Sequence, residues 1–551
     1  LLRPAEKITS ASSEGVSGGT GGNGFRLLQY LGAGRSDYAM KLGRTPPKPH
    51  FAVLVAGTEK KKGGRAAGSV AAGGMGFGIR RFYEYAPTAI TVKPDVVALE
   101  LLPDDPEQEM HMLDQGRQRT HEVLLDFSAG AAQHLAAFQA PRLLAAAPPA
   151  WYADTGVFGM IAEEPKDLSK YPAEQRKDIA EFYRLQRRLV DPKLARSGKS
   201  VFECFHPGWL DYGDLIWRPG WCNGHYDWTL GMLLGYLRTG DRRFFEAADA
   251  FAWHRFDVAQ NHNAEFCQVN GRYKWSRALT YYEKDDHRTV GKGPKQTHSW
   301  NRGIAYYGLL TGNETARETA LFNGVGIEGY FKGSIDDGKW RGNWRDGGRP
   351  YSSVGQEQRA EGWSVENFLG CYEAGGDEKW KKYAANLFKA SMLDYRRRDA
   401  LKGKVPNALM FGYVLSPSCR AHYYSGDAEV LAGIKYIIDE GVLADTGMLK
   451  YGKKGNDGHV PTVFMYQGKQ NPAHNIMYAN PVAYLYMQTG DEKYLRISRQ
   501  LFRSSVRWEA GFGGVTPGHG TKVNGWLGRF NQIYLYMEKQ LARGVKFPAQ
   551  H

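Results

Sequence analysis

Histidine, tyrosine, arginine and carboxylate residues gather in four short segments in the second half of the chain. The segments are residues 223–228 (NGHYDW), 297–302 (THSWNR), 359–363 (RAEGW) and 471–478 (NPAHNIMY). Histidine and tyrosine can accept or donate protons, and arginine can bind a carboxylate through two parallel hydrogen bonds. Brought together in one cleft, side chains of these types could bind an acidic ligand and move protons on it.

Each of these residues also has an ordinary structural interpretation. His225 could hydrogen-bond a neighbouring helix, and Asp227 could cap the helix that follows it. Arg302 and Arg359 could form ion pairs within the protein instead of binding a ligand. A tryptophan recurs at a similar place in three of the segments and suits core packing as well as stacking on a sugar ring. These residues are Trp228, Trp300 and Trp363.

A repeated turn indicates how the chain positions the four segments. At five places a glycine followed by aspartate or asparagine ends a run of helical periodicity. These pairs are Gly240-Asp241, Gly312-Asn313, Gly376-Asp377, Gly426-Asp427 and Gly490-Asp491. Glycine accepts the left-handed conformation that stops one helix, and aspartate or asparagine caps the next helix. The pattern predicts five helical hairpins, and residues 526–541 could supply a sixth.

The helices that enter these turns carry apolar residues at helical spacing, as in Leu230, Leu233, Leu234 and Leu237. The repeats differ in length and carry long loops. This favours an (α/α) toroid over a superhelix of uniform repeats, with a solenoid as the open alternative. In a toroid the starts of the inner helices line a central cleft. Each of the four polar segments precedes such a helix, so we expect them to converge there.

The first part of the chain has a different pattern. Short apolar or alternating runs predict strands at residues 51–55, 89–93, 96–102 and 121–127. The predicted fold class is therefore multidomain α+β, with an N-terminal antiparallel β-sheet domain followed by an (α/α) toroid of helical hairpins. The predicted boundaries are a flexible lead at 1–24, a β-sandwich or barrel-like domain at 25–160, a helical connector at 161–200 and a catalytic (α/α)6-type toroid at 201–551.

Composition limits the classes of partner. The 551 residues carry 72 Lys and Arg against 58 Asp and Glu, a net charge of +14, and 13% of them are aromatic. Positive charge concentrates anionic ligands, and aromatic rings stack on sugars. Zinc-finger, basic-zipper and ribonucleoprotein motifs are missing, so we expect an acidic polysaccharide or oligosaccharide as the partner rather than nucleic acid. No apolar stretch approaches the length of a membrane span.

The sequence gives no clear signal for a metal or cofactor. The five cysteines have no CxxC spacing, the histidines have no HExxH spacing, and no EF-hand loop is present. We expect no metal site and no cofactor, while a calcium ion (Ca²⁺) held by scattered oxygen atoms stays open as an alternative.

Four stretches resemble a known family. Residues 225–241 (HYDWTLGMLLGYLRTGD) and 298–313 (HSWNRGIAYYGLLTGN) are similar to the toroid domain of exo-rhamnogalacturonan lyase-like proteins, polysaccharide lyase family 26 and its bacterial relatives. Residues 114–127 (DQGRQRTHEVLLDF) and 149–159 (PAWYADTGVFG) are similar to that family's central β domain and its exit. The resemblance implies a β-sheet domain, an (α/α) toroid and β-elimination on uronic-acid polymers such as the rhamnogalacturonan of pectin. The family carries more β structure ahead of the toroid than this chain does.

β-Elimination sets requirements that the four segments could meet. The uronate carboxylate must be neutralised, a base must reach the C5 proton, and a proton must reach the leaving oxygen on C4. We expect His298 or Tyr226 to act as the base and a tyrosine to act as the acid. The candidate catalytic residues are Tyr226, His298, His225 and Tyr478. The candidate substrate-binding residues are Asn223, Asp227, Asn301, Arg302, Arg359, Glu361, Trp363, His474 and Asn475.

Two other functions stay open at this point. A glycoside hydrolase needs two carboxylates that flank the scissile bond, and Asp227 and Glu361 occupy equivalent positions in their repeats. A non-catalytic carbohydrate-binding protein would need the cleft without its reactive groups. A polymeric uronate substrate predicts a secreted or periplasmic protein. The sequence leaves open the oligomeric state, the particular polymer, and exo or endo action.

Overall fold

The computed structural model describes most of the chain in two compact units. The described residues are 8–11, 19–20, 25–30, 51–56, 59–63, 66–72, 75–93, 96–104, 118–128, 130–197, 201–205, 207–214, 224, 226–262, 267–269, 272–274, 298–331, 333–341, 345–346, 349–350, 356–401, 408–445, 447, 449–451, 462–466, 469–470, 475–512 and 529–548. Unit 1 comprises Leu1–Leu144, Cys204–Cys222 and Glu283–Val290. Unit 2 comprises Ala145–Glu203, Asn223–Tyr282 and Gly291–His551.

Unit 1 contains two five-stranded antiparallel sheets, with strand orders β10-β7-β6-β1-β2 and β5-β4-β3-β8-β9. The strands are β1 (Ile8–Ala11), β2 (Gly19–Thr20), β3 (Phe25–Tyr30), β4 (Phe51–Ala56), β5 (Glu59–Gly63), β6 (Ser69–Ala72), β7 (Met75–Ile79), β8 (Thr88–Lys93), β9 (Val96–Glu100) and β10 (Val123–Asp126). In the central strand of the second sheet, Leu27 pairs with Leu54 on one side and with Ile90 on the other. The four strands predicted from apolar runs are confirmed as β4, β8, β9 and β10.

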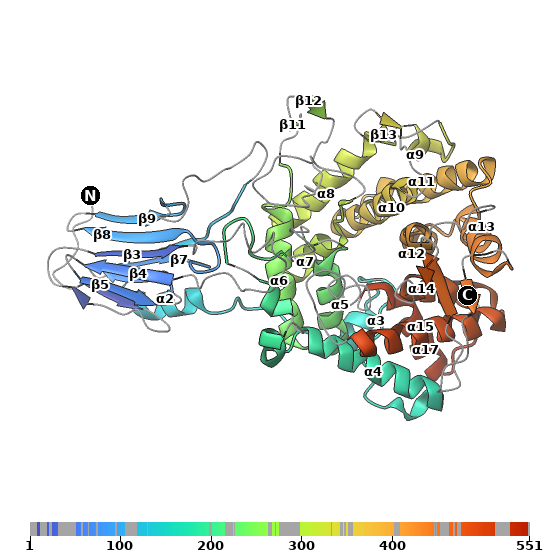
Figure 1. The fold of residues 1–551 in the computed structure, drawn as a ribbon, viewed down its shortest axis with the longest axis horizontal. Helices are drawn as coiled ribbons and strands as arrows, with labels where there is room; N and C mark the ends of the chain where they lie inside the picture. The colour runs from blue at the N-terminus through green and yellow to red at the C-terminus, as the bar shows by residue number, and fades with distance from the viewer. Residues whose placement is uncertain are drawn as a thin grey trace. The chain divides into compact units, whose positions relative to one another are not determined.

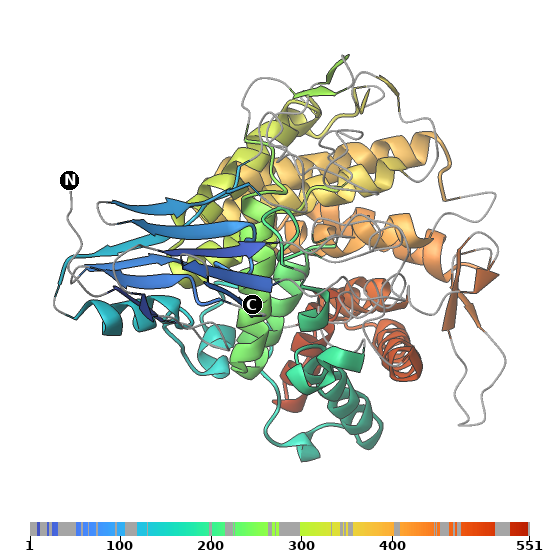
Figure 2. The same cartoon turned by 60° about the vertical axis from the view of Figure 1, so that its left-hand side comes forward.

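The two sheets of unit 1 share one hydrophobic core. Leu27 of β3 and Val70 of β6 are both buried in it, so the alternating residues of each sheet face inward. Figure 2 shows the strands of this unit as blue layers. Helix α2 (Ala131–Gln139) packs on β7, where a Cβ at Gly78 would lie 3.1 Å from Leu135 Cδ2. The missing side chain therefore lets the helix approach the sheet closely.

Unit 2 contains the five predicted helical hairpins, which are confirmed. They are α5 (Trp228–Thr239) with α6 (Arg242–Phe256), α7 (Arg302–Thr311) with α8 (Glu314–Glu328), α10 (Gln356–Gly375) with α11 (Glu378–Arg397), α12 (Ala408–Ser425) with α13 (Ala428–Tyr436), and α14 (Ile476–Thr489) with α15 (Glu492–Phe512). The glycine of every turn is left-handed, with φ between 66° and 73°. In the first turn, Asp241 Oδ1 accepts a hydrogen bond of 3.1 Å from the amide of Arg243. Helix stop and helix start are thus encoded by adjacent residues.

The first helix of each hairpin packs against the first helix of the next. The order is α5, α7, α10, α12, α14 and finally α17 (Gln532–Ala542). The second helices lie outside them, and a continuous core of buried apolar side chains extends across α10 to α17. In Figure 1 the hairpins follow one another in chain order around unit 2, from green α5 to red α17. We call the six first helices the inner helices.

Helix α4 (Ala173–Leu189) lies within the region predicted as a connector, and it belongs to unit 2. It packs against α15, where Arg503 Nε donates a 2.7 Å hydrogen bond to Asp178 Oδ2. Its Gln175 accepts a hydrogen bond from Tyr534 of α17. Two other parts of the chain differ from the predicted boundaries. Strands β1 and β2 lie within the predicted lead, and Cys204–Cys222, within the predicted toroid, belongs to unit 1.

Shorter elements complete the described parts of the chain. They are α3 (Pro149–Asp154), α9 (Ser334–Asp337), the 3₁₀ turns Leu168–Lys170, Pro192–Ser197 and Val201–Cys204, the π-helical turn Ile437–Leu443, and the strands β11 (Cys267–Val269), β12 (Arg272–Lys274), β13 (Arg345–Asp346), β14 (Arg349–Pro350), β15 (Leu449–Tyr451), β16 (Thr462–Tyr466) and β17 (Lys469–Gln470). Among the described residues, no helix has both the length and the apolar character needed to cross a bilayer.

Candidate functional site

The predicted polar segments lie at the N-terminal ends of inner helices. Tyr226 and Asp227 directly precede α5, His298 precedes α7, Arg359 lies in the first turn of α10, and Asn475 directly precedes α14. Asn223, His225 and His474 lie outside the described residues. The repeat therefore puts the described members of all four segments at equivalent ends of their helices.

Four side chains from different inner helices meet in one group, which we call the His298 cluster (His298, Arg359, Tyr413 and Tyr226). Arg359 Nη1 lies 3.1 Å from His298 Nε2, and its guanidinium carbon lies 5.1 Å from the centre of the Tyr413 ring. The rings of Tyr413 and Tyr226 are stacked, with centroids 6.0 Å apart and planes inclined by 10°. His298 is 6% exposed and Arg359 is 9% exposed, so the cluster is largely shielded from water.

The chemistry of arginine fixes the protonation of His298. A guanidinium has only donors, so His298 Nε2 must accept the hydrogen bond from Arg359 and must carry no proton in this arrangement. The imidazole is then neutral, with its proton on Nδ1. The Nε2 lone pair of His298 accepts from the guanidinium of Arg359, a group that can also bind a carboxylate.

Tyr413 is a member of the cluster that the sequence analysis missed. It lies in the second turn of α12, within the apolar run Phe411-Gly412-Tyr413-Val414-Leu415, so no polar neighbour marks it. Burial raises the pKa of Tyr413, while the positive charge of Arg359 acts in the opposite direction. The sequence feature that could have pointed to Tyr413 is its position near the start of the fourth inner helix.

The backbone that carries Tyr226 is strained. Tyr226 has φ of 75° and Asp227 has φ of 59°, and left-handed conformations cost about 1–2 kcal/mol for each non-glycine residue. Two consecutive residues of this kind persist only where surrounding contacts hold them, and such strain gathers at functional sites.

The hydrogen bonds of Asp227 help to stabilise this strained backbone. Its Oδ1 accepts a hydrogen bond of 3.1 Å from the Leu230 amide, and its Oδ2 accepts one of 3.1 Å from the Gly303 amide in α7. The N-cap interpretation of Asp227 is therefore confirmed. Burial raises the pKa of Asp227, although the positive charge of Arg529 and the hydrogen bonds from the two amides act to lower it.

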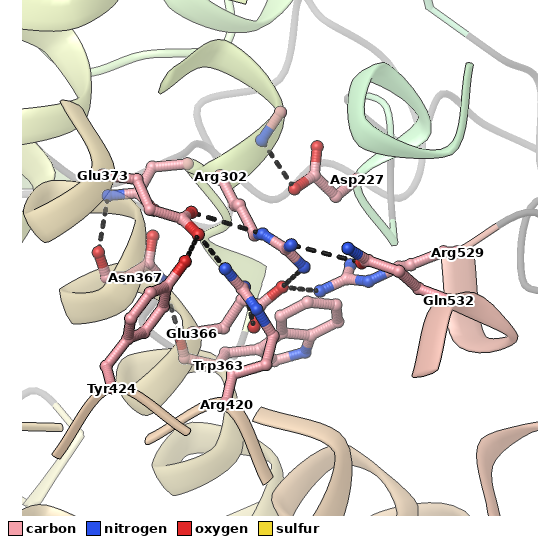
Figure 3. Close-up of polar contacts among 12 residues, drawn as sticks. Asp227, Arg302, Trp363, Glu366, Asn367, Glu373, Arg420, Tyr424, Arg529 and Gln532 are labelled. Carbon is pink, nitrogen blue, oxygen red and sulfur yellow. Dashed lines mark hydrogen bonds and ion pairs between the residues drawn. The ribbon is translucent and has the colours of Figure 1, made fainter. Parts of the chain in front are cut away.

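Below the His298 cluster along α10, five charged side chains form a second group, the arginine–glutamate cluster (Arg302, Arg420, Arg529, Glu366 and Glu373). Each of the five side chains is at most 5% exposed. Arg529 Nη2 donates a hydrogen bond of 2.9 Å to Glu366, and Glu373 pairs with Arg420 and, at 3.3 Å, with Arg302. Figure 3 shows the three guanidiniums gathered around the two carboxylates.

Neutral side chains complete the arginine–glutamate cluster. Tyr424 donates a 2.7 Å hydrogen bond to Glu373, and Arg302 Nη2 donates to the hydroxyl of Tyr306 at 2.6 Å. Burial acts to raise the pKa of Glu366, but the charges of the three arginines outweigh it and hold that pKa below its usual value. A cavity of about 10 Å³, roughly the space of one water molecule, is lined by all three arginines and Glu366. The cluster is thus a compensated ionic core, and it contains Arg302, one of the predicted binding residues.

An aromatic layer separates the two clusters. The ring centroid of Trp363 lies 5.3 Å from that of Tyr413 and 5.7 Å from that of Trp300. Trp363 also contacts the arginine–glutamate cluster, because the guanidinium carbon of Arg529 lies 4.4 Å from the centroid of its ring. Trp363 was predicted to bind substrate, and here it packs between the His298 cluster and the ionic core.

The remaining predicted residues contact neighbouring helices. Asn301 Nδ2 donates to the backbone oxygens of Ala320 and Asn367, and Asn475 Nδ2 donates to Ser504 Oγ at 2.8 Å. Glu361 accepts a hydrogen bond from the hydroxyl of Tyr395 in α11. Tyr478 is fully buried, and burial raises its pKa well above the usual value. The structure therefore brings Tyr226, His298 and Arg359 together and directs Asn301, Asn475 and Glu361 toward helix packing.

The described residues contain no group of three or more His, Cys, Asp or Glu side chains arranged to hold a metal ion. The described histidine and carboxylate side chains of the two clusters bind arginine, tyrosine or backbone groups instead, as in the contact of His298 with Arg359.

Comparison with known proteins gives structural likenesses at low sequence identity. No protein-family model and no curated protein sequence matches the chain. A family 76 glycoside hydrolase from a bovine Bacteroides thetaiotaomicron strain is similar, with a TM-score of 0.42, 9% identity and coverage of 98% of this chain and 94% of that one. A cellobiose 2-epimerase from Spirochaeta thermophila has a TM-score of 0.38, 11% identity and coverage of 67% and 99%. The unsaturated glucuronyl hydrolase of Bacillus sp. GL1 has a TM-score of 0.37, 13% identity and coverage of 67% and 97%.

Proposed function

We propose that this protein is a carbohydrate-active enzyme, a carbon–oxygen lyase that cleaves a uronic-acid-containing polysaccharide by β-elimination. The observation that carries the proposal is the 3.1 Å contact between Arg359 and the unprotonated Nε2 of His298, beside the stacked rings of Tyr413 and Tyr226. This group combines a cation, a base and two phenols. A β-elimination on a uronate needs the same three kinds of group.

The first step pairs the substrate carboxylate with Arg359. A carboxylate binds a guanidinium more strongly than a neutral imidazole does, because the contact is charge-assisted and can be bidentate. When the carboxylate takes the guanidinium, the Nε2 lone pair of His298 is released. Since the carboxylate is attached to C5, the released base lies beside the proton that it must remove.

The second step breaks the bond between C4 and its oxygen. His298 takes the C5 proton, the electron pair of the C5–H bond forms the C4–C5 double bond, and the C4–O bond breaks with its electron pair on the leaving oxygen. Tyr413 or Tyr226 then donates its phenolic proton to the leaving oxygen. Burial keeps Tyr413 protonated before the reaction, because it raises the pKa of that hydroxyl.

Low exposure of the cluster has a consequence for binding. His298 and Arg359 are at most 9% exposed, so entry of a sugar requires the groups that cover them to move. A site that closes over its substrate excludes water and strengthens the attraction between Arg359 and the carboxylate. The proposed polymer substrate favours a secreted or periplasmic location, and the mechanism uses no cofactor.

The hydrolase alternative has less support from the carboxylates that were proposed for it. Asp227 binds two backbone amides, and Glu361 binds Tyr395 of the outer helix α11. Glu366 is held ionised by three arginines, whereas a hydrolase acid needs a raised pKa. One observation favours the hydrolase as the second candidate, because burial raises the pKa of Asp227, as a hydrolase acid requires.

Incubation with rhamnogalacturonan and with other uronate polymers tests the proposal. A lyase produces a conjugated, unsaturated uronate whose ultraviolet absorbance grows with time, and it should not act on the same polymer after its carboxyl groups are reduced to alcohols. New reducing ends without that absorbance would identify a hydrolase. Binding of the polymer without either product would identify a carbohydrate-binding protein and overturn the enzymatic proposal.

A further inference from the structure

Arg529 joins the His298 cluster to the arginine–glutamate cluster. Its Nη1 donates a hydrogen bond of 2.8 Å to the backbone carbonyl of Tyr226, and its Nη2 donates one of 2.9 Å to Glu366. The flat guanidinium also stacks over Trp363 at 4.4 Å. One buried side chain thus holds the strained backbone at Tyr226 with one nitrogen and the ionic core with the other.

Glu366 is itself fixed in place. Arg302 Nη1 lies 3.6 Å and Arg420 Nη1 lies 3.5 Å from its carboxylate, in addition to the hydrogen bond from Arg529. Arginines from two helices, α7 and α12, and from the segment before α17 therefore converge on this carboxylate of α10. Because Glu366 is held from several directions, it can in turn fix the position of Arg529.

We propose that Arg529 is a positioning residue, anchored by Glu366, that holds the carbonyl of Tyr226 so that the left-handed backbone presents the Tyr226 ring to Tyr413. The inference rests on the proposed function for its effect on turnover, but its structural part does not. Arg529 touches the backbone of Tyr226 and acts on the reaction through that residue.

The geometry of arginine is required for this role. The planar fork presents two nitrogens in fixed directions, one for the carbonyl and one for the carboxylate, while its face covers the Trp363 ring. A lysine at this position would keep the positive charge but offer a single nitrogen. The three N–H groups of lysine radiate from that one atom and lack the two fixed directions of the guanidinium, so we expect the strained turn to lose one of its supports.

The test compares Arg529→Lys and Glu366→Gln with Glu373→Gln. Glu373 is a matched control, because it lies in the same ionic core and is equally buried, but its ion pairs are with Arg302 and Arg420. Crystal structures of the variants report the φ of Tyr226 and the distance from residue 529 to its carbonyl. Kinetics on the uronate polymer, at a temperature where all variants are folded, report kcat and KM separately.

We expect Arg529→Lys to release the Tyr226 carbonyl and to lower kcat about 10²-fold, since a misplacement of about 1 Å can cost that much, with KM changed less than about threefold. Glu366→Gln should give a smaller loss of the same kind. Glu373→Gln should lower thermal stability but keep both the Tyr226 geometry and kcat.

Two outcomes would overturn the inference. One is an Arg529→Lys structure in which Tyr226 keeps its φ and stacks on Tyr413 as before. The other is an equal loss of kcat in Glu366→Gln and Glu373→Gln, which would show a general effect of disturbing the core. If the wild-type protein performs no elimination, the proposed function fails, and the crystal structures alone still decide whether Arg529 positions Tyr226.

Discussion

The His298 cluster and the arginine–glutamate cluster both place buried arginines on inner helices, yet they treat the positive charge differently. In the arginine–glutamate cluster, carboxylates of the protein lie against the guanidiniums, as in the pair of Arg420 and Glu373. In the His298 cluster, Arg359 hydrogen-bonds a neutral imidazole and lies over a phenol ring. We expect the guanidiniums that lie against protein carboxylates to serve as framework, and we expect a carboxylate of the proposed substrate to replace the imidazole that contacts Arg359.

The largest expected effect is on turnover in the His298 cluster. Replacement of the proposed base, His298→Ala, should lower kcat on a uronate polymer by about 10³-fold, as is typical for loss of a general base. The free energy of unfolding should fall by about 1–3 kcal/mol, because a buried N–H of Arg359 loses its acceptor. Ultraviolet absorbance of the unsaturated product measures the first quantity, and urea denaturation measures the second.

A second histidine, His422, controls for the loss of an imidazole outside the His298 cluster. His422 lies near the C-terminal end of α12, where its Nδ1 is 2.6 Å from the hydroxyl of Tyr484. His422→Asn should keep kcat within about twofold of wild type, since it touches neither the substrate nor the cluster. Equal losses in the two variants would remove His298 from the role of base.

Substitutions in the arginine–glutamate cluster should lower the free energy of unfolding more than they lower kcat. Arg420→Met leaves Glu373 and Glu366 with less compensation, and loss of one partner of a buried ion pair typically costs about 3–5 kcal/mol of unfolding free energy. The double variant Arg420→Met/Glu373→Met should recover part of this loss, because the carboxylate that lost its Arg420 partner is also removed, although Arg302 then loses its contact with Glu373. A double variant no more stable than the single one would contradict the view of this cluster as a compensated core.

Neutralising the exchangeable arginine should affect charged substrates selectively. Arg359→Gln should lower kcat/KM on the ionised polymer about 10²-fold, as for loss of one electrostatic stabiliser of the transition state. On the methyl-esterified polymer, which has no carboxylate charge, the ratio of wild-type to variant activity should be several times smaller. An equal ratio on both polymers would mean that Arg359 does not bind the uronate carboxylate.

Much of the helical scaffold could be predicted from the sequence because local residues encode it. Each Gly-Asp or Gly-Asn pair determines where one helix stops and the next begins, and the left-handed glycines and capping side chains are present at all five turns. Four of the ten described strands of unit 1 followed from apolar runs in the same way, whereas β1 and β2 lie in the stretch predicted as a flexible lead. Residue types close together in the chain are therefore enough to locate the start of each inner helix.

The contacts within the site depend on long-range packing and could be predicted less completely. Tyr413 lies inside α12 among apolar neighbours, and Arg420 lies between Cys419 and Ala421 in the second half of the same helix, so the sequence analysis singled out neither. Arg302 is the last residue of a polar segment, but its side chain contacts Glu366 and Glu373. Which arginine meets a carboxylate and which meets a histidine is decided by residues many positions away, and this decides their roles.

Acid should act on the framework through Glu366. Its pKa is lower in the folded protein than the usual 4.5, so its ionised form contributes stability at higher pH, and that contribution is lost as the pH falls below about 4.5. Glu366→Gln cannot lose a charge in this range. Its unfolding free energy should therefore fall less steeply with acidification than that of wild type, as measured by urea denaturation between about pH 3 and pH 6. Parallel curves would show that Glu366 does not carry this dependence.

The smallest expected effect concerns Tyr478, which the sequence analysis grouped with the catalytic candidates. Tyr478 is a fully buried side chain of α14 whose pKa burial raises well above the usual value, and it is not among the four residues of the His298 cluster. Tyr478→Phe should change kcat less than about threefold, since removal of a non-reacting hydroxyl costs at most about one hydrogen bond. Tyr226→Phe is the comparison, because it removes a phenol from the His298 cluster and should lower kcat more. If Tyr478→Phe abolished elimination while Tyr226→Phe did not, the proton donor would belong to α14, and the division between reacting cluster and framework would have to be redrawn.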